Sequence, residues 1–136
     1  MGCGRVGATL ARSLSDLGHD VAVIDMDPTS FRRLGSSFEG RTITGMGFDR
    51  GVLVAAGIRE AYAFAAVSSG DNSNILAARV ARETFGVEHV AARIYDPRRA
   101  AVYQRLGIPT VATVRWTADQ IIHRLLPTGS VPAFTD

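Results

Sequence analysis

The sequence contains no lysine, since all fifteen of its basic residues are arginine. A phosphate-binding loop of the Walker type and a Schiff-base enzyme both require a lysine, so both classes are excluded. The single cysteine, Cys3, excludes an intrachain disulfide and a thiolate metal cluster, and indicates a reducing compartment. The formal net charge of +2 comes without a dense basic stripe. We therefore expect no metal site and no nucleic-acid partner.

Long apolar runs are also lacking. No stretch approaches the ~18–20 apolar residues that a transmembrane helix requires, and the first residues are rich in glycine, unlike a secretory signal. If the protein serves a membrane, we expect it to do so as a soluble, cytoplasmic partner. The 136 residues fit a single domain with a substantial core.

Apolar runs typical of buried parallel strands alternate with segments of helical periodicity. The expected strands are 20–26, 41–44, 61–68, 89–95 and 108–113. The expected helices are 5–17, 28–35, 49–56, 71–85 (capped by Asp71 or Asn72), 97–106 and 117–126. This order predicts an α/β fold, with a Rossmann-like, doubly wound parallel sheet and three layers. We expect residues 1–126 to form this domain and 127–136 a linker or tail.

The sequence opens on a glycine pattern, Gly2-Cys3-Gly4-Arg5-Val6-Gly7. Such a loop forms a tight turn, lets phosphate approach the backbone, and packs the following helix closely on the sheet. Arg5 is either a phosphate ligand or a solvated residue of the first helical turn, and Cys3 is expected to be a small loop residue. A loop of this kind normally follows a strand, so we expect that the first, central strand is missing ahead of Gly2.

An acidic residue follows the glycine loop at the distance that dinucleotide-binding domains require. Asp25 ends the second expected strand, where its carboxylate is placed to accept both ribose hydroxyls. A 2′-phosphate would meet Asp25 and Asp27 on either side of Met26, which disfavours NADP. The structural alternative is that Asp25 only caps the helix that starts at Pro28.

Further candidates follow the other strands, whose carboxyl ends face the same cleft. Met46 is either an adenine contact or a buried gap-filler. Ser68 and Ser69 either bind ribose or phosphate, or cap the next helix. Arg93 lies near the end of a buried strand, where its charge needs a phosphate or carboxylate partner.

The sequence resembles the TrkA-type RCK N-terminal domain, also called KTN. The resemblance rests on Gly-Cys-Gly-Arg-Val-Gly at 2–7, Val-Ile-Asp at 23–25, Ala-Val-Ser-Ser-Gly-Asp-Asn-Ser-Asn at 66–74 and Ala-Arg-Ile-Tyr-Asp-Pro at 92–97. It implies a non-catalytic regulatory subunit of Trk/Ktr potassium uptake systems, which binds NAD(H), ATP or ADP. It also implies a homo-oligomer, with dimers building a ring, at the inner face of the cell membrane beneath a potassium transporter subunit.

Carried over by this resemblance, residues 2–7 hold phosphates, Asp25 holds the ribose, and Ser68, Ser69 and Arg93 complete the site. The sequence departs from the family at 45–47, where Gly-Met-Gly replaces Gly-Asp-Ala, so the base preference is open. Family members usually continue into a second RCK domain, and 127–136 resembles the linker to it.

Two other functions remain open. One is an NAD-dependent oxidoreductase or a fragment of one, although none of the three histidines is expected in the cleft and no Tyr-x-x-x-Lys pair exists. The other is a sensor domain of another ion transporter. The last helix carries Ile121, Ile122, Leu125 and Leu126 on one side. This face is expected either to contact another subunit or to pack on its own sheet.

Overall fold

The computed structural model describes residues 1–126 as an alternation of helices and strands. The strands are β1 (Ala22–Asp25), β2 (Arg41–Thr44), β3 (Ala63–Ala66), β4 (His89–Ile94) and β5 (Thr110–Ala112). The α-helices are α1 (Arg5–Asp16), α2 (Arg50–Ala56), α3 (Asp71–Arg79), α4 (Pro97–Arg105) and α5 (Thr113–Leu125). Shorter helical segments are η1 (Pro28–Leu34), η2 (Ile58–Glu60) and η3 (Val80–Thr84). The predicted linker at 127–136 lies outside the described residues.

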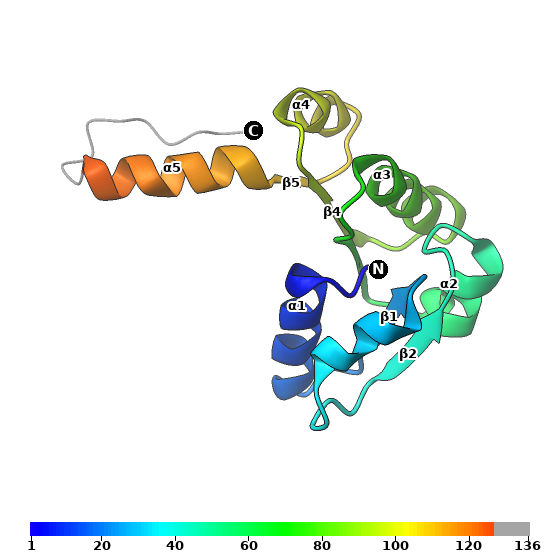
Figure 1. The fold of residues 1–136 in the computed structure, drawn as a ribbon. Helices are drawn as coiled ribbons and strands as arrows, with labels where there is room; N and C mark the ends of the chain where they lie inside the picture. Colours follow the sequence, from blue (N-terminus) through cyan, green and yellow to red (C-terminus); the bar gives the residue numbers. More distant parts are fainter. Residues whose placement is uncertain (127–136) are drawn as a thin grey trace.

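All strand pairs in the described chain are parallel, as predicted, but they form two sheets. One sheet pairs β1 with β2, and the other has the order β3-β4-β5. The first two residues lie between the sheets. The Gly2 N–H donates to the Ile24 carbonyl at 2.8 Å, and Val67 N–H donates to the Met1 carbonyl at 2.8 Å. The α/β fold is therefore confirmed, with residues 1–2 joining its two halves (Figure 1).

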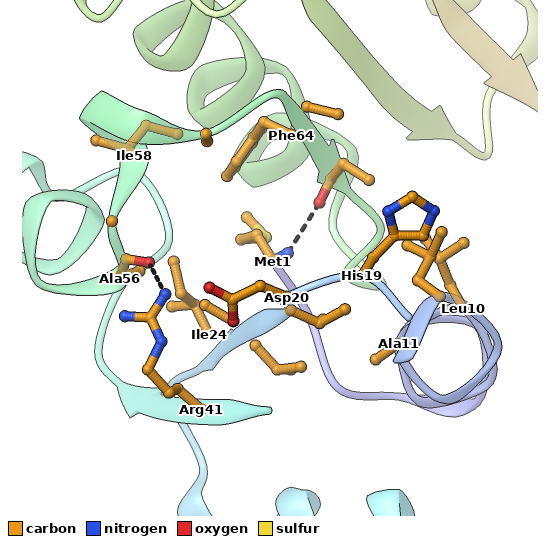
Figure 2. Close-up of a pocket in the computed structure, with 18 of the residues that line it drawn as sticks. Met1, Leu10, Ala11, His19, Asp20, Ile24, Arg41, Ala56, Ile58 and Phe64 are labelled. Carbon is orange, nitrogen blue, oxygen red and sulfur yellow. Dashed lines mark hydrogen bonds between the residues drawn. The ribbon is translucent and has the colours of Figure 1, made fainter. Parts of the chain in front are cut away.

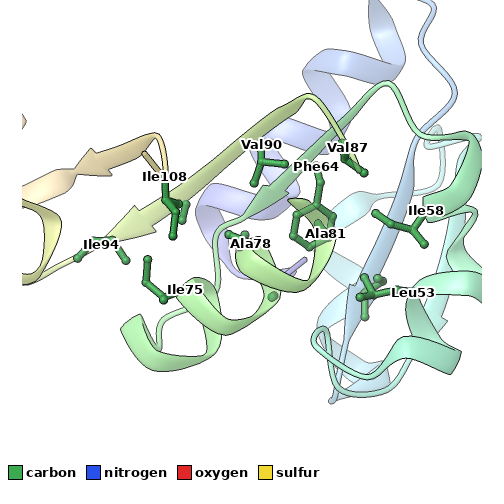
Figure 3. Close-up of a cluster of buried hydrophobic side chains, with 14 of the residues drawn as sticks. Leu53, Ile58, Phe64, Ile75, Ala78, Ala81, Val87, Val90, Ile94 and Ile108 are labelled. Atoms are coloured by element: carbon green, nitrogen blue, oxygen red, sulfur yellow. The ribbon is translucent and has the colours of Figure 1, made fainter. Parts of the chain in front are cut away.

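The main core lies between α3 and the sheet of β3, β4 and β5 (Figure 3). Leu53 of α2 and Ile94 of β4 are its largest fully buried apolar side chains. Burial of a side chain of this size stabilises the fold by about 1.5–3 kcal/mol. A smaller cluster packs Cys3, Ala8 and Ala11 against Val23 and Leu34. This cluster fixes the start of α1 against β1, which is where the glycine loop lies.

Aspartates define the start of three helical segments. Asp27, Asp49 and Asp96 each accept a backbone N–H of the following turn, in η1, α2 and α4 respectively. Such caps satisfy donors that the helix itself leaves free. The prediction that Asp71 or Asn72 caps the helix at 71–85 is wrong, because Gly70 is the N-cap residue of α3 and no side chain caps this helix. The Asp71 carboxylate is engaged by a neighbouring loop, as described below.

Three predicted helices differ in form from the sequence prediction. The segment at Pro28 is a 3₁₀ helix, and 71–85 changes from α-helix to a π-helical turn at Val80. The last helix starts at Thr113, four residues earlier than predicted, and none of its residues is buried. It projects away from the body of the domain (Figure 1), so its apolar side does not pack on its own sheet. None of the helices in residues 1–126 combines the length and apolar character needed to cross a bilayer.

Candidate functional site

The glycine loop has the geometry that its spacing predicts. Gly2 has φ +101°, and a Cβ added to it would lie 2.6 Å from the Ser68 backbone nitrogen. A Cβ on Gly7 would lie 1.8 Å from the Gly2 carbonyl oxygen. Neither position therefore has room for a side chain. By contrast, Gly4 has open space around its Cβ position, so the tight constraints lie at the two ends of the loop.

The start of α1 carries free backbone donors. Its N-cap is Gly4, no side chain caps it, and its first turn contains no acidic residue. Arg5 and Val6 are exposed there. Within the described residues, no hydrogen bond or ion pair of the Arg5 side chain is recorded. A helix N-terminus with free N–H groups attracts an anion, and an adjacent guanidinium adds to this attraction.

Asp25 connects the glycine loop to the end of β1. One carboxylate oxygen accepts the Cys3 N–H at 2.7 Å, and the other accepts the Asp27 N–H at 2.8 Å. The structural alternative is wrong, since Asp27 rather than Asp25 caps η1. A carboxylate has about four acceptor positions, so two remain for hydroxyl donors of a ligand. Asp25 is thus fixed in place beside the loop and keeps accepting capacity.

The surroundings shift the pKa values of two groups near Asp25, the Cys3 thiol and the Asp27 carboxylate. Burial, and secondarily the Asp25 charge, raises the pKa of the Cys3 thiol, which contacts the Ser30 carbonyl at 3.4 Å. The hydrogen bonds from Thr29 lower the pKa of Asp27. The thiol therefore stays neutral and Asp27 stays charged. Arg33, which sequence reasoning missed, also reaches this place and donates to the Cys3 carbonyl at 3.4 Å.

Ser68 lies next to Gly2 but does not cap α3. Its hydroxyl donates to the Asn74 side-chain oxygen at 2.6 Å, and its backbone N–H donates to the same oxygen at 2.9 Å. The Asn74 amide nitrogen donates to the Ser68 carbonyl at 2.9 Å and to the Arg93 carbonyl at 2.8 Å. Asn74 thus holds the ends of β3 and β4 together. Ser69 is exposed and has room for a ligand.

Asn74 was missed by the sequence prediction, although a signal was present. It is fully buried, and it lies on the face of α3 that also buries Ile75 and Ala78. An asparagine among buried apolar residues of a helix needs partners, and here the loop backbone provides them. Asp71 has a similar role, since its two oxygens accept the backbone N–H groups of Tyr95 and Asp96 at 2.8 and 3.0 Å.

The remaining predicted residues lie at the carboxyl ends of their strands. Met26 follows β1 and is 63% exposed, and Met46 follows β2 and is 44% exposed, which excludes a buried gap-filler. Arg93 is half-buried in β4. Asp25 bonds to the glycine loop, Gly2 of that loop lies against Ser68, and Asn74 joins Ser68 to the Arg93 backbone. These residues therefore lie together at one edge of the sheets. The Gly45 N–H donates to the Asp25 carbonyl at 3.0 Å, which brings the segment before Met46 to the same edge.

The cavity between β1 and β3 does not coincide with this edge. It measures about 710 Å³ and lies between β1 and β3, behind Met1 and towards the amino ends of the strands (Figure 2). Its walls are mostly strand backbone and apolar side chains. Ligands of open α/β sheets bind outside the carboxyl ends instead. We therefore locate the candidate site at the glycine loop and treat the cavity as a separate feature.

Replacing Asn74 with leucine should destabilise the domain by about 3 kcal/mol. The buried backbone groups of Ser68 and Arg93 would lose their partners, and each such group costs about 1–3 kcal/mol. Urea unfolding measures the change. The matched control is Asn72→Leu, two residues away and exposed, which should stay within about 0.5 kcal/mol. Equal effects of the two substitutions would contradict a specific role of Asn74.

The stability of the 136-residue chain should increase with pH. The Met1 ammonium is buried and donates to the Ala65 carbonyl, and burial lowers its pKa from 8.0 to about 6, against the opposing charge of Asp25. Between these values the unfolded chain binds more protons than the folded chain, so stability rises with pH. The two-unit shift corresponds to about 2.7 kcal/mol between pH ~5.5 and ~8.5.

Urea unfolding across this pH range measures the effect, and an N-acetylated chain is the control because acetylation removes the charge. The acetylated chain still carries the three histidines, so its pH dependence is subtracted. Stability that falls or stays level with rising pH after this subtraction would show that the ammonium is not buried in the folded state.

With the site described, the chain can be compared with known proteins. The TrkA-N domain family matches residues 1–114. The chain belongs to this family. It is 76% identical, over all 136 residues, to a Trk system potassium uptake protein TrkA from Streptomyces coelicolor, and it spans 61% of that protein. A TrkA homolog from Pyrococcus abyssi is 37% identical over 78% of the chain, which spans 47% of that relative.

Solved structures confirm the Rossmann-like fold. The Kef C-terminal domain of Shewanella denitrificans, in an AMP-bound form, superposes with a TM-score of 0.78 at 21% identity, covering 96% of this chain and 79% of that one. The TrkA-N domain of the inner membrane protein ybaL from Escherichia coli has a TM-score of 0.77 at 21% identity, covering 91% and 92%. The chain thus spans about half the length of these TrkA relatives, 61% of one and 47% of the other, and nearly all of the ybaL domain.

Proposed function

We propose that this chain is the nucleotide-binding regulatory domain of a Trk-type potassium uptake protein, and that it binds NAD(H) or ATP/ADP at the glycine loop. The single observation that carries the proposal is the contact between the Asp25 carboxylate and the Cys3 N–H, which fixes an acceptor beside the loop. The assignment to a potassium uptake system is supported by the relatives, which are named as TrkA proteins of Trk potassium uptake systems. The AMP-bound neighbour supports the ligand class.

In this proposal, different residues bind the phosphates, the ribose and the base of the nucleotide. Phosphates lie at the uncapped start of α1, with Arg5 as a charged partner. The remaining acceptor positions of Asp25 bind ribose hydroxyls, and the exposed Met26 and Met46 offer apolar contacts to the base. Ser69 and Arg93 complete the far side of the site, next to the Asn74-bound Ser68.

Regulation requires that the nucleotide prefer one conformation of the assembly. A decisive shift of a two-state equilibrium takes about 5.5 kcal/mol of differential binding. Two or three charge-assisted hydrogen bonds, at about 1.5–3 kcal/mol each, are of this size. An additional phosphate beside Arg5 or Arg93 would supply this difference. The proposed readout is a membrane potassium transporter subunit, with the domain on the cytoplasmic face of the cell membrane.

The assembly we propose is a homo-oligomer in which dimers build a ring, and α5 is the contact surface. Ile121 and Leu125 lie on one side of this helix, at 55% and 72% exposure. An unburied apolar face of this kind is typical of an interaction surface. Light scattering with nucleotide present should show dimers or larger species. A monomer at all concentrations would contradict the ring.

An oxidoreductase is the second candidate, because the same fold supports many functions. It would need a proton donor in the cleft. His19 and His89 are exposed and lie towards the amino ends of β1 and β4, and His89 stacks on Tyr62 at a ring distance of 4.4 Å. The His123 Nε2 atom lies 3.5 Å from an Asp119 carboxylate oxygen on α5. These positions favour a non-catalytic domain.

Two measurements together test the proposal. The wild-type chain should copurify with a detergent-solubilised Trk membrane subunit, and the amount retained should change when NADH or ATP is added. NADH absorbance at 340 nm should stay constant with a broad panel of carbonyl substrates. Steady NADH oxidation would favour the oxidoreductase, and the absence of copurification under all nucleotide conditions would favour another transporter.

A further inference from the structure

Two tyrosines are largely exposed, and they lie at opposite ends of the sheet of β3, β4 and β5. Tyr62, 78% exposed, lies at the amino end and stacks on His89. Tyr95, 65% exposed, follows β4 at the carboxyl end, where we locate the candidate site. Within residues 1–126, no hydrogen bond or ring contact of the Tyr95 side chain is recorded. An exposed aromatic ring at a ligand-binding edge is a candidate for contact with the ligand.

The backbone at Tyr95 is held in place by α3. The Tyr95 N–H donates to one carboxylate oxygen of Asp71 at 2.8 Å, and the Asp96 N–H donates to the other at 3.0 Å. Two residues before Tyr95, the Arg93 carbonyl accepts the Asn74 amide at 2.8 Å. The first turn of α3 therefore fixes the backbone on both sides of Tyr95, and a ring on a fixed backbone loses less freedom when a ligand binds.

Arg93 and Tyr95 point away from α3. Ala92 and Ile94 are fully buried in the main core, which α3 covers (Figure 3). Because successive residues of a strand point to opposite faces, Arg93 lies on the other face of the sheet. Continuing this alternation by one residue beyond β4 places Tyr95 there as well. A guanidinium and an aromatic ring therefore lie on one face at the carboxyl end of β4.

The glycine loop leads into α1 on this same face. Ile24 of β1 belongs to the main core, whereas the adjacent Val23 packs with Ala8 of α1. The helix α1 therefore lies on the face opposite to the main core. Since the first two residues bond to both β1 and the segment of β3, the two sheets share this face. The free backbone donors at the start of α1 thus lie on the same side of the sheets as Arg93 and Tyr95.

The strand register gives the separation between the glycine loop and Arg93. Ala66 of β3 pairs with Ala92 of β4, so one residue further Val67 lies beside Arg93. The Val67 N–H donates to the Met1 carbonyl, directly before the loop. Neighbouring strands lie ~4.8 Å apart, so about two such spacings, roughly 10 Å, separate the loop from Arg93. Asp25 lies on the opposite side of the loop, at the end of β1.

We propose that Tyr95 stacks on the second base of a dinucleotide, the nicotinamide ring of NAD(H), and thereby distinguishes a dinucleotide from a mononucleotide. This inference rests on the nucleotide site proposed above. With phosphates at the start of α1 and the first ribose at Asp25, the adenosine half extends over β1 and β2. The second nucleoside then extends the other way, past Arg93 to Tyr95. AMP, ADP and ATP end at their phosphates, so the Tyr95 ring adds nothing to their affinity.

The probes are NADH and ADP-ribose, because ADP-ribose keeps both riboses and both phosphates and lacks only the nicotinamide. Calorimetric titration should show that the wild-type chain binds NADH at least about fivefold more tightly than ADP-ribose, the size of effect that stacking of a base on an aromatic ring provides. Tyr95→Ala should lower the affinity for NADH to that for ADP-ribose and leave ADP-ribose within about twofold. Tyr95→Phe keeps the ring and should bind NADH as the wild type does.

Tyr62→Ala is the matched control, since it removes an exposed tyrosine at the opposite end of the sheet. It should leave both affinities within about twofold. The proposal is overturned if the wild type binds NADH and ADP-ribose equally, if Tyr95→Ala weakens both ligands alike, or if Tyr62→Ala causes the same loss. ADP-ribose reports on the glycine loop without Tyr95. Binding of ADP-ribose without preference for NADH therefore contradicts the role of Tyr95 alone, whereas binding of neither ligand contradicts the nucleotide site as well.

Discussion

Replacing Gly7 with alanine should abolish nucleotide binding and destabilise the domain by about 3 kcal/mol. The added methyl group would lie 1.8 Å from the Gly2 carbonyl oxygen, which is backbone and cannot rotate away. Relief requires α1 to move off the loop, and overpacking of this kind costs about 1–3 kcal/mol or more. Displacing α1 also removes the N–H groups that we propose as phosphate ligands. Urea unfolding and calorimetric titration with NADH and ATP measure the two effects.

Gly4→Ala is the matched control for stability within the same loop, because Gly4 itself belongs to the proposed phosphate site. Its backbone has φ −79°, and nothing lies within 4 Å of the added Cβ. We expect stability within about 0.5 kcal/mol of wild type and an unchanged thermal midpoint. If Gly7→Ala binds nucleotide as well as the wild-type chain does, the loop is not the phosphate site.

Replacing Asp25 with asparagine should weaken nucleotide binding by at least about tenfold. An amide presents only one accepting atom, and its NH₂ group would face the N–H donor of either Cys3 or Asp27. A hydrogen bond to a charged group contributes about 1.5–3 kcal/mol, and 1.4 kcal/mol corresponds to a factor of ten in affinity. The measurement is the dissociation constant for NADH, with AMP as a shorter ligand that retains the ribose.

Asp27→Asn separates this effect from a general loss of charge. Asp27 is exposed and caps η1 through Thr29, and asparagine is an equally good cap. We expect Asp27→Asn to keep nucleotide affinity within about twofold, by the near-neutrality of exposed substitutions. Equal losses in both variants would indicate an electrostatic effect of the whole acidic segment, and would remove the specific role of Asp25.

The glycine spacing was sufficient to predict the loop, and the apolar runs between segments of helical periodicity were sufficient to predict the α/β fold, because both follow from local sequence pattern. The partners of buried polar groups were not predictable in the same way. Asn74 and Asp71 bind loop backbone that comes from other strands, and only the folded chain brings those segments together. Arg33 was missed for the same reason, since its approach to Cys3 spans thirty residues.

The last helix shows where local pattern was insufficient. The apolar side of this helix fitted two alternatives, a subunit contact and packing on its own sheet, equally well. Helical periodicity indicates that one face of a helix is apolar, but it does not indicate what covers that face. The projection of α5 from the body removes packing on its own sheet and leaves the proposed subunit contact.

The most direct test of the nucleotide-binding account is a calorimetric titration of the domain with NADH, NAD, ATP and ADP. We predict saturable binding of at least one of these nucleotides, lost in Gly7→Ala and weakened in Asp25→Asn. Absence of binding by all four at millimolar concentration would contradict the account.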